Sequence, residues 1–125
     1  LTGSAMKFCR AFDPKVFFNA TAGAQGATWC YLVPTLWSML LDYAGGHPDL
    51  KNSQPWKRLR LLRSAGSDLP HALALRLSEF FGDNVRVLPT YGMTEAMPIA
   101  SPPLNYRLER PCSVGRALPG VSVEI

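Results

Sequence analysis

The sequence predicts an α/β fold, in which helices pack on a parallel β-sheet. Three β-prone apolar runs, at residues 27–33, 59–63 and 85–88, alternate with segments whose apolar residues recur at helical spacing. Parallel neighbours need a long crossover, usually a helix, so this alternation is typical of a parallel sheet. The chain has 125 residues, 47% hydrophobic and 18% charged, which is enough apolar sequence to close a core.

The first two elements are a helix and a strand. Asp13 before Pro14 is a typical helix start, with a capping side chain followed by proline at the first helical position. We expect this helix to run to about Ala22 and to end at Gly23. The continuous apolar run Ala27–Val33 is typical of a strand that is covered on both faces.

A second helix is expected to begin at Pro34 and to end at Gly45 and Gly46. The turn-forming segment His47–Trp56 then predicts a surface loop. Four apolar residues of this helix recur at helical spacing and define its expected inner face: Leu36, Met39, Leu40 and Tyr43.

The second half of the chain repeats the alternation. A strand over 59–63 is followed by a helix that Asp68 caps and Gly82 ends, and then by a strand over 85–88. The apolar stripe of that helix consists of Leu69, Leu73, Leu77 and Phe80. If the strands are parallel and both helices cover the sheet, the buried leucines should include Leu36, Leu40, Leu73 and Leu77.

The character of the sequence changes after Leu88. Six prolines predict a long irregular stretch that returns to a strand only at Val121, and long loops usually carry function. We therefore divide a single partial domain, 1–125, into a βαβ layer over 1–88 and a loop with its connection over 89–125. The first residue is not methionine and the last five resemble a strand, so we expect a piece of a longer chain.

Charge does not indicate a nucleic-acid partner. The net charge is +4, and the main basic cluster lies around Lys57, Arg58 and Arg60. Leucines interleave with these charges, as they do at a strand edge and its approach loop, so binding to nucleic acid is not predicted. The longest apolar stretch, 29–41, is interrupted by a proline and by polar residues, so we expect no membrane span.

The cysteines predict a reducing compartment. Cys9, Cys30 and Cys112 are widely separated and lack metal-ligand spacing, which argues against a disulfide framework and against a zinc site. No targeting peptide is visible, so the expected location is the cytoplasm or another reducing compartment.

The candidate site follows the last parallel strand, in the segment Tyr91–Glu95. Ligands of open α/β sheets bind at the carboxyl ends of the strands. The residue types suit a nucleotide, because Tyr91 can stack on a base and Gly92 permits close backbone approach. Thr94 offers a hydroxyl to a phosphate, and Glu95 offers a carboxylate to Mg²⁺. Taken alone, the same five residues could also be a core aromatic and a solvated turn.

This segment, YGMTE, resembles the nucleotide-binding signature of the adenylate-forming superfamily, which includes acyl-CoA synthetases, luciferases and adenylation domains. Residues 63–70, RSAGSDLP, are similar to the family's small-residue loop before a helix. Residues 113–121, SVGRALPGV, resemble its SVGRPLPGV segment, and residues 28–36 resemble its strand-then-helix stretch TxxxxVPTLL. The resemblance covers nearly the whole chain, with the motifs in the same order and at similar spacing.

Two positions depart from the family pattern. Cys112 stands where the family often has glycine, and Ser67–Asp68 stands where Ala-Pro is commoner. The segment after YGMTE most resembles adenylation domains that hand an acyl group to a carrier protein.

The resemblance implies an ATP-dependent enzyme that uses Mg²⁺. Such an enzyme joins a carboxylic acid to AMP, releases pyrophosphate, and passes the acyl group to the thiol of CoA or of a carrier protein. It implies that Tyr91 and the backbone of Ala65 and Gly66 lie near the adenine, with Gly92 also in the nucleotide site.

The resemblance also implies the catalytic and substrate-binding residues. Thr94 would contact the phosphates and Glu95 would bind Mg²⁺, and both would be catalytic. Met93 and Ala96 would border the acyl pocket. If one nucleotide lies between the loops 64–68 and 91–95, both loops must leave the same end of the sheet and face one cleft.

Three parts of the family pattern are not among these residues. They are the phosphate-binding loop that ends in Pro-Lys-Gly, the Asp that binds the ribose, and the C-terminal domain with its lysine. We therefore expect the segment alone to be inactive. The alternative role is a non-catalytic structural or interaction element, derived from this fold, within a larger assembly.

Overall fold

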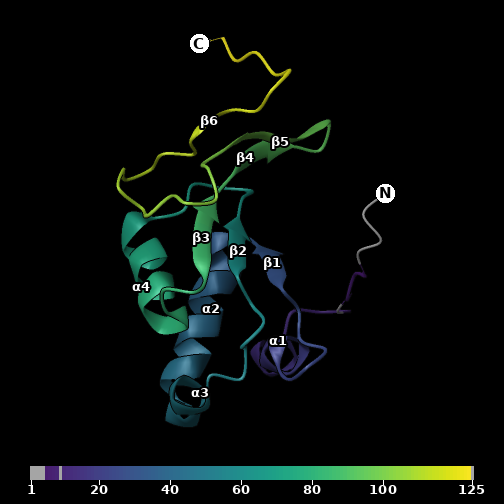
Figure 1. Cartoon of the computed structure of the whole chain (residues 1–125), viewed down its shortest axis with the longest axis vertical. Coiled ribbons are helices and arrows are strands. Elements are labelled where there is room, and N and C mark those ends of the chain that lie inside the picture. The colour runs from purple at the N-terminus through teal and green to yellow at the C-terminus, as the bar shows by residue number, and fades with distance from the viewer. Residues whose placement is uncertain (1–4, 9, 125) are drawn as a thin grey trace.

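A three-stranded parallel sheet forms the centre of the computed structural model, which describes residues 5–8 and 10–124. Its strands are β1 (Trp29–Leu32), β2 (Leu61–Ser64) and β3 (Arg86–Pro89), in the order β1-β2-β3 (Figure 1). Both pairings are parallel, and their register aligns Trp29 with Leu61 and Leu61 with Arg86. The predicted α/β fold is therefore confirmed.

The described part of the chain forms four helices beside the sheet. They are α1 (Pro14–Thr21), α2 (Pro34–Gly45), α3 (Pro48–Ser53) and α4 (His71–Phe81). Helices α2 and α4 share one core with β2 and β3, and α1 lies below β1 in the view of Figure 1. Among the described helices, none has the length and apolar character that crossing a membrane would need.

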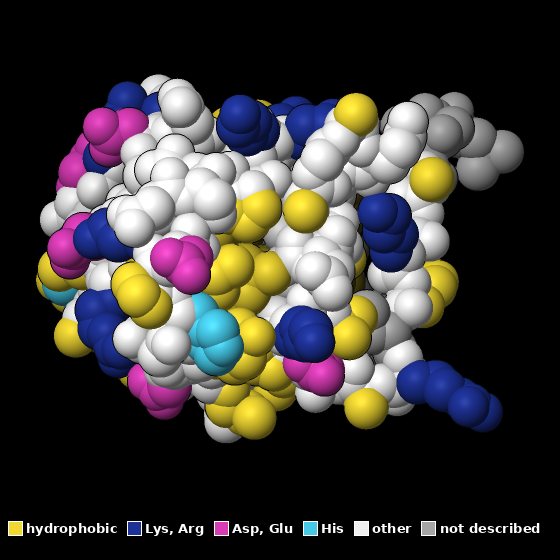
Figure 2. All heavy atoms as spheres, turned by 90° about the horizontal axis from the view of Figure 1, so that it is seen from below, with side chains coloured by type: hydrophobic (Ala, Val, Ile, Leu, Met, Phe, Trp, Pro, Cys, Tyr) yellow, Lys and Arg dark blue, Asp and Glu magenta, His cyan; other side chains and the backbone are white. Residues whose placement is uncertain are grey.

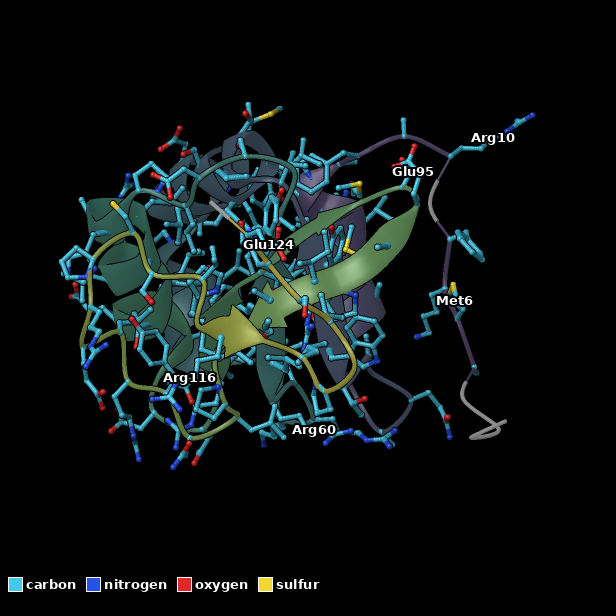
Figure 3. All side chains as sticks on the ribbon, turned by 90° about the horizontal axis from the view of Figure 1, so that it is seen from above. Met6, Arg10, Arg60, Glu95, Arg116 and Glu124 are labelled. Atoms are coloured by element: carbon cyan, nitrogen blue, oxygen red, sulfur yellow. The ribbon has the colours of Figure 1, made fainter. Side chains whose placement is uncertain are left out.

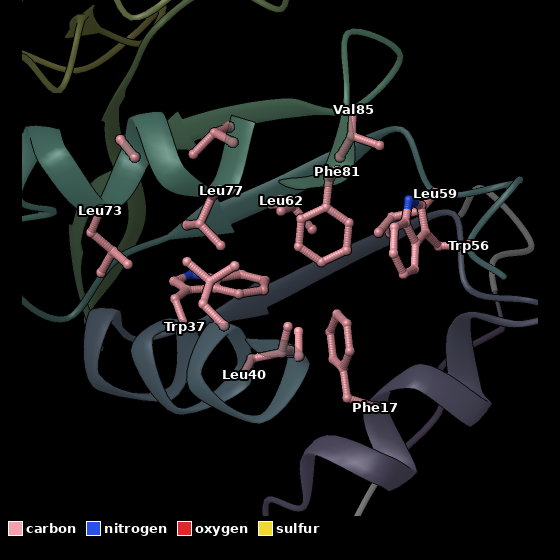
Figure 4. Packing of buried hydrophobic residues seen from close by; sticks show 14 of the residues in the cluster. Phe17, Trp37, Leu40, Trp56, Leu59, Leu62, Leu73, Leu77, Phe81 and Val85 are labelled. Carbon is pink, nitrogen blue, oxygen red and sulfur yellow. The ribbon is translucent and has the colours of Figure 1, made fainter. Parts of the chain in front are cut away.

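The core between helices and sheet is built on Trp37, which is fully buried together with Leu40, Leu62 and Leu77. The ring of Phe17 meets Trp37 edge to face with centroids 6.0 Å apart, and this contact ties α1 to α2 (Figure 4). Each such large side chain contributes about 1.5–3 kcal/mol on burial. Three of the four leucines expected to be buried are buried, and Leu36 is half-buried.

Helix α1 follows the prediction. Its cap is Asp13, whose carboxylate accepts a hydrogen bond from the Lys15 N–H at 2.8 Å. At the end of α1, the ammonium group of Lys7 donates to the carbonyl of Ala20 in the last turn, at 3.3 Å, and to that of Gln25 beyond the helix, at 2.9 Å. A cation at this end of a helix satisfies carbonyl groups that have no partner within the helix.

The inner face of α2 was predicted wrongly. After Pro34 at its start, the buried residues are Trp37, Leu40, Leu41 and Ala44, whereas Met39 is 47% exposed. The buried set recurs at i, i+3, i+4 and i+7, so it is a regular helical stripe, rotated from the predicted one because it includes the large indole.

Two further predictions for the first half were wrong. Strand β1 is not covered on both faces, because it lies at the edge of the sheet with Trp29 51% exposed and Tyr31 also exposed. The segment after α2 is not a loop, because Pro48 starts the short helix α3. A proline at the first helical position fixes the backbone dihedral angle that a helix needs, and Leu50 of α3 packs against the core.

Figure 2 shows the molecule from below relative to Figure 1. Hydrophobic side chains reach the surface in the middle of the face seen there, among charged residues.

Helix α4 begins later than predicted, at His71. Its cap is Pro70, and its first backbone hydrogen bond runs from the Ala74 N–H to the Pro70 carbonyl, so Asp68 does not cap it. The side chain of Leu69 is buried before the helix begins, which draws this part of the chain toward the core.

A second, antiparallel sheet occupies the stretch predicted to be irregular. Its strands, in spatial order, are β4 (Tyr91–Met93), β5 (Ala96–Ser101) and β6 (Arg116–Ala117). This sheet lies beyond the carboxyl ends of the parallel strands (Figure 1). The strand predicted at Val121 is not formed over 121–124, because the Val121 N–H closes a turn onto the Leu118 carbonyl at 3.0 Å. Ile125 lies outside the described residues.

The loop between β5 and β6 explains why glycine suits the position that Cys112 occupies. The φ angle of Cys112 is +58°, in the left-handed region that glycine enters without a steric penalty. A cysteine here carries a Cβ in a conformation that L-residues avoid.

Replacing Cys112 by glycine should therefore stabilise the protein. The left-handed strain relieved is about 1–2 kcal/mol, and the extra chain entropy of an unfolded glycine returns about 0.5–1 kcal/mol. We expect Cys112→Gly to raise the free energy of unfolding by roughly 0.5–1 kcal/mol in urea titration. Cys112→Ser, which keeps the Cβ, is the control and should change little. A Cys112→Gly protein no more stable than the serine variant would contradict this explanation.

Candidate functional site

The candidate site lies where the three parallel strands end together. The Ala65 N–H donates to the Leu32 carbonyl at 3.4 Å, and the Thr90 N–H donates to the Ser64 carbonyl at 2.7 Å. These bonds continue the strand pairing by one residue past β2 and β3. The segments that begin at Ala65 and at Tyr91 therefore leave the same end of the sheet, as predicted.

The first of these segments exposes Gly66 beside a buried alanine. Ala65 is fully buried, and Gly66 is exposed with a φ angle of +92°. A Cβ at Gly66 would lie 3.0 Å from Cγ1 of Val33, so this position favours glycine for both its backbone angle and its space. The exposed main chain of Gly66 thus lies beside the Val33 side chain, and the exposed residues Ser67 and Asp68 follow it.

The second segment was predicted to be a loop and is instead a strand and a turn. Tyr91 and Met93 lie on β4 and are 47% and 46% exposed. Thr94 and Glu95 form the turn into β5, and both are exposed. Figure 3 shows Glu95 at the tip of the β4–β5 hairpin, far from Arg116 on β6. The hairpin thus presents an aromatic ring, a hydroxyl and a carboxylate to the surroundings.

Gly92 is closely approached by a side chain of this chain, whereas the approach of a nucleotide to its backbone stays a prediction. A Cβ at Gly92 would lie 2.6 Å from the Met97 sulfur and 3.2 Å from the Ala96 carbonyl oxygen. The same sulfur lies 3.8 Å from the Tyr31 hydroxyl of β1. Sequence reasoning missed Met97 and Tyr31, because 66 residues separate them and no motif links them.

The carboxylate of Glu95 suits a magnesium ion that takes few ligands from the protein. In residues 5–8 and 10–124 there is no group of three or more His, Cys, Asp or Glu side chains that could hold a metal. Glu95 is an exposed carboxylate. Mg²⁺ is commonly held by one or two carboxylates, with water and phosphate oxygens completing its shell, so a single carboxylate beside a phosphate is sufficient.

A hollow of about 640 Å³ lies elsewhere, between the end of β5, the loop that follows it and β6. Its lining includes Tyr106, Arg110 and Arg116, and no residue of 64–68 or 91–95. A single cleft shared by those two loops therefore stays a prediction.

A family model described as AMP-binding enzyme matches residues 1–125. The chain belongs to this family. Among curated proteins, it is 36% identical over 92 residues to the oxalate–CoA ligase of Arabidopsis thaliana, and 33% identical over 99 residues to the mitochondrial malonate–CoA ligase ACSF3 of Homo sapiens. These matches cover 72% and 74% of this chain, and 17% of each relative.

Solved structures of the family agree with this fold. The ATP-bound MatB of Rhodopseudomonas palustris is 32% identical with a TM-score of 0.73, and the match covers 92% of this chain and 21% of MatB. VinN in complex with L-aspartate is 31% identical with a TM-score of 0.73, covering 90% of this chain and 27% of VinN. The chain therefore spans only a small part of the length of these relatives.

Cys30 of β1 is a half-buried thiol whose pKa is shifted by its surroundings in the fold. Burial raises its pKa from 9.0 to about 12, because a thiolate loses its hydration there. A thiol whose pKa is raised stays neutral through the physiological range and is a poor nucleophile.

Cys30 should therefore resist alkylation in the folded protein. A pKa of about 12 makes its thiolate population at pH 8 roughly a thousandfold smaller than that of an unperturbed cysteine. Iodoacetamide at pH 8, followed by peptide mass spectrometry, should modify the exposed Cys112 and leave Cys30 intact until urea unfolds the protein. Cys9 lies outside the described residues and is replaced by serine in this assay. Equal native rates at Cys30 and Cys112 would contradict the burial argument.

Proposed function

We propose that this chain is the nucleotide-binding segment of an ATP-dependent ligase that activates a carboxylic acid and passes it to a thiol. In the first step a carboxylate oxygen attacks the α-phosphorus of ATP. The bond to the β-phosphate breaks, and acyl-AMP and pyrophosphate result. In the second step the thiol attacks the acyl carbon and AMP leaves. The observation that carries this proposal is the YGMTE sequence on β4 and its turn, at the carboxyl end of a parallel sheet.

In this proposal the adenine lies between the backbone of Ala65–Gly66 and the ring of Tyr91. Three features support it. Gly66 is exposed, Tyr91 is half exposed, and both segments start at the same end of the sheet. Stacking of a base on an aromatic ring contributes about 1–3 kcal/mol.

The phosphates and their metal ion belong at the hairpin tip. Thr94 donates its hydroxyl to an anionic oxygen of the phosphate chain, and Glu95 would hold Mg²⁺. A bound Mg²⁺ would supply positive charge beside the phosphate oxygens. Support comes from the exposure of both side chains and from the family match.

The acyl group is assigned to the side of the hairpin near Met93 and Ala96, and the acceptor to CoA. Curated relatives at 33–45% identity bear the names of CoA ligases or of an acyl-CoA synthetase, including the oxalate and malonate enzymes. The carrier-protein acceptor has weaker support: PA1221, a protein containing adenylation and PCP domains, is 23% identical, so it supports the fold alone.

Full activity in this proposal depends on residues outside this chain, because the chain covers 12–17% of three of its curated relatives. The chain by itself should support no exchange of pyrophosphate into ATP. Exchange belongs to the longer protein that contains it.

Glu95→Ala in that longer protein should reduce exchange of labelled pyrophosphate into ATP by about a hundredfold or more. Loss of a carboxylate that binds the metal removes a few kcal/mol of transition-state stabilisation. The deficit should shrink as Mg²⁺ is raised, and stability should barely change, since Glu95 is exposed in a turn.

The matched control is Glu79→Ala, which removes an exposed carboxylate from α4 and should leave exchange unchanged. Near-normal exchange by Glu95→Ala at limiting Mg²⁺ would remove the metal assignment. No exchange by the unaltered longer protein with any carboxylic acid would favour a structural or interaction element instead.

A further inference from the structure

The side chain of Met97 joins three elements near the candidate site. It starts on β5, lies over Gly92 of β4 and reaches Tyr31 of β1 (Figure 3 gives the surroundings of the hairpin). Its sulfur is 3.8 Å from the Tyr31 hydroxyl and lies in the space that a Cβ at Gly92 would need, 2.6 Å from that position. A methionine in this place contacts the antiparallel sheet and the parallel sheet at once.

The pairing of β4 with β5 is irregular at this point. Tyr91 pairs with Ala100 and Met93 with Ala96, so the register shifts between Tyr91 and Met93, where Gly92 lies. Between these pairs β4 has one residue, Gly92, and β5 has three, residues 97–99, so the extra residues of the bulge are on β5. A bulge bends the strand that carries it and reorients its side chains. Met97 is the first residue of the bulge and packs over Gly92, so its side chain presses on β4 between Tyr91 and Met93.

The contact is of a kind that positions a strand without adding much stability. A thioether sulfur is a weak hydrogen-bond acceptor and packs well against an aromatic ring. Both ends of the contact are partly solvated, since Met97 is 52% and Tyr31 is 39% exposed. Losing such a contact changes the equilibrium between two orientations of a strand by about two- to tenfold.

We propose that Met97 is a positioning residue for the nucleotide: its thioether, seated on Gly92 and against Tyr31, fixes the orientation of β4. This inference rests on the proposed function, in which Tyr91 of β4 lies beside the adenine. The contact also explains why residue 92 is a glycine, apart from any approach of a ligand, since any side chain at 92 would displace Met97.

The test is a double-mutant cycle in the longer protein that contains the chain. Gly92→Ala pushes the thioether away, and Met97→Ala removes it, so both changes abolish the same contact. We expect each to raise the KM for ATP about fivefold with little change in kcat, and the double variant to be no worse than either alone. Met39→Ala, at a methionine of similar exposure on α2, is the matched control and should leave KM unchanged.

Two results would overturn the inference. One is a KM for ATP that Met97→Ala leaves unaltered. The other is an additive cycle, with the double variant about twenty-fivefold worse, which would mean that Gly92 and Met97 act independently.

A second measurement does not depend on enzymatic activity. With ¹³C-methyl methionine, Gly92→Ala and Tyr31→Phe should each shift the Met97 methyl resonance and leave that of Met39 in place. A methyl resonance that neither change moves would reject the contact itself. Shifted resonances in a protein without pyrophosphate exchange would instead retain the contact and reject the proposed function.

Discussion

The pairing of β2 with β3 is the constraint on which the candidate site depends. Four aligned residue pairs and one further bond, from the Thr90 N–H to the Ser64 carbonyl at 2.7 Å, bring the ends of these strands to one level. Parallel strands must be separated by a crossover, and α4 provides it while filling the core with Leu73 and Leu77. The segments that begin at Ala65 and at Tyr91 leave the sheet side by side because β2 and β3 end at the same level.

Much of this fold could be predicted, because the apolar runs and the helical spacing report burial directly. Strands β1, β2 and β3 were found because each is an apolar run in the sequence, and the start of α1 was found from the pair Asp13–Pro14. The inner face of α2 was missed because it is decided by which side of the helix Trp37 takes, and that depends on Phe17 and the sheet. The short strands β4 to β6 were missed because prolines lie among them, and because β6 pairs with β5 across a loop of irregular sequence.

The candidate site was likewise only partly predictable. The residues proposed to contact the nucleotide could be named from the sequence, since Tyr91, Thr94 and Glu95 fall within one short motif. The residues that pack against this motif could not be named. The contact between Met97 and Tyr31 depends on the register of a hairpin and on the exposed edge of β1, and neither leaves a pattern in the chain.

In the proposed function, the nucleotide binds at the end of the parallel sheet and not in the hollow beside β6. Photolabelling with 8-azido-ATP distinguishes these two places, in the longer protein that contains this chain, with excess ATP as competitor. We expect competed label on the peptides that contain Gly66 and Tyr91. Competed label confined to residues 102–118, which include most of the lining of the hollow, would show that the nucleotide binds there instead.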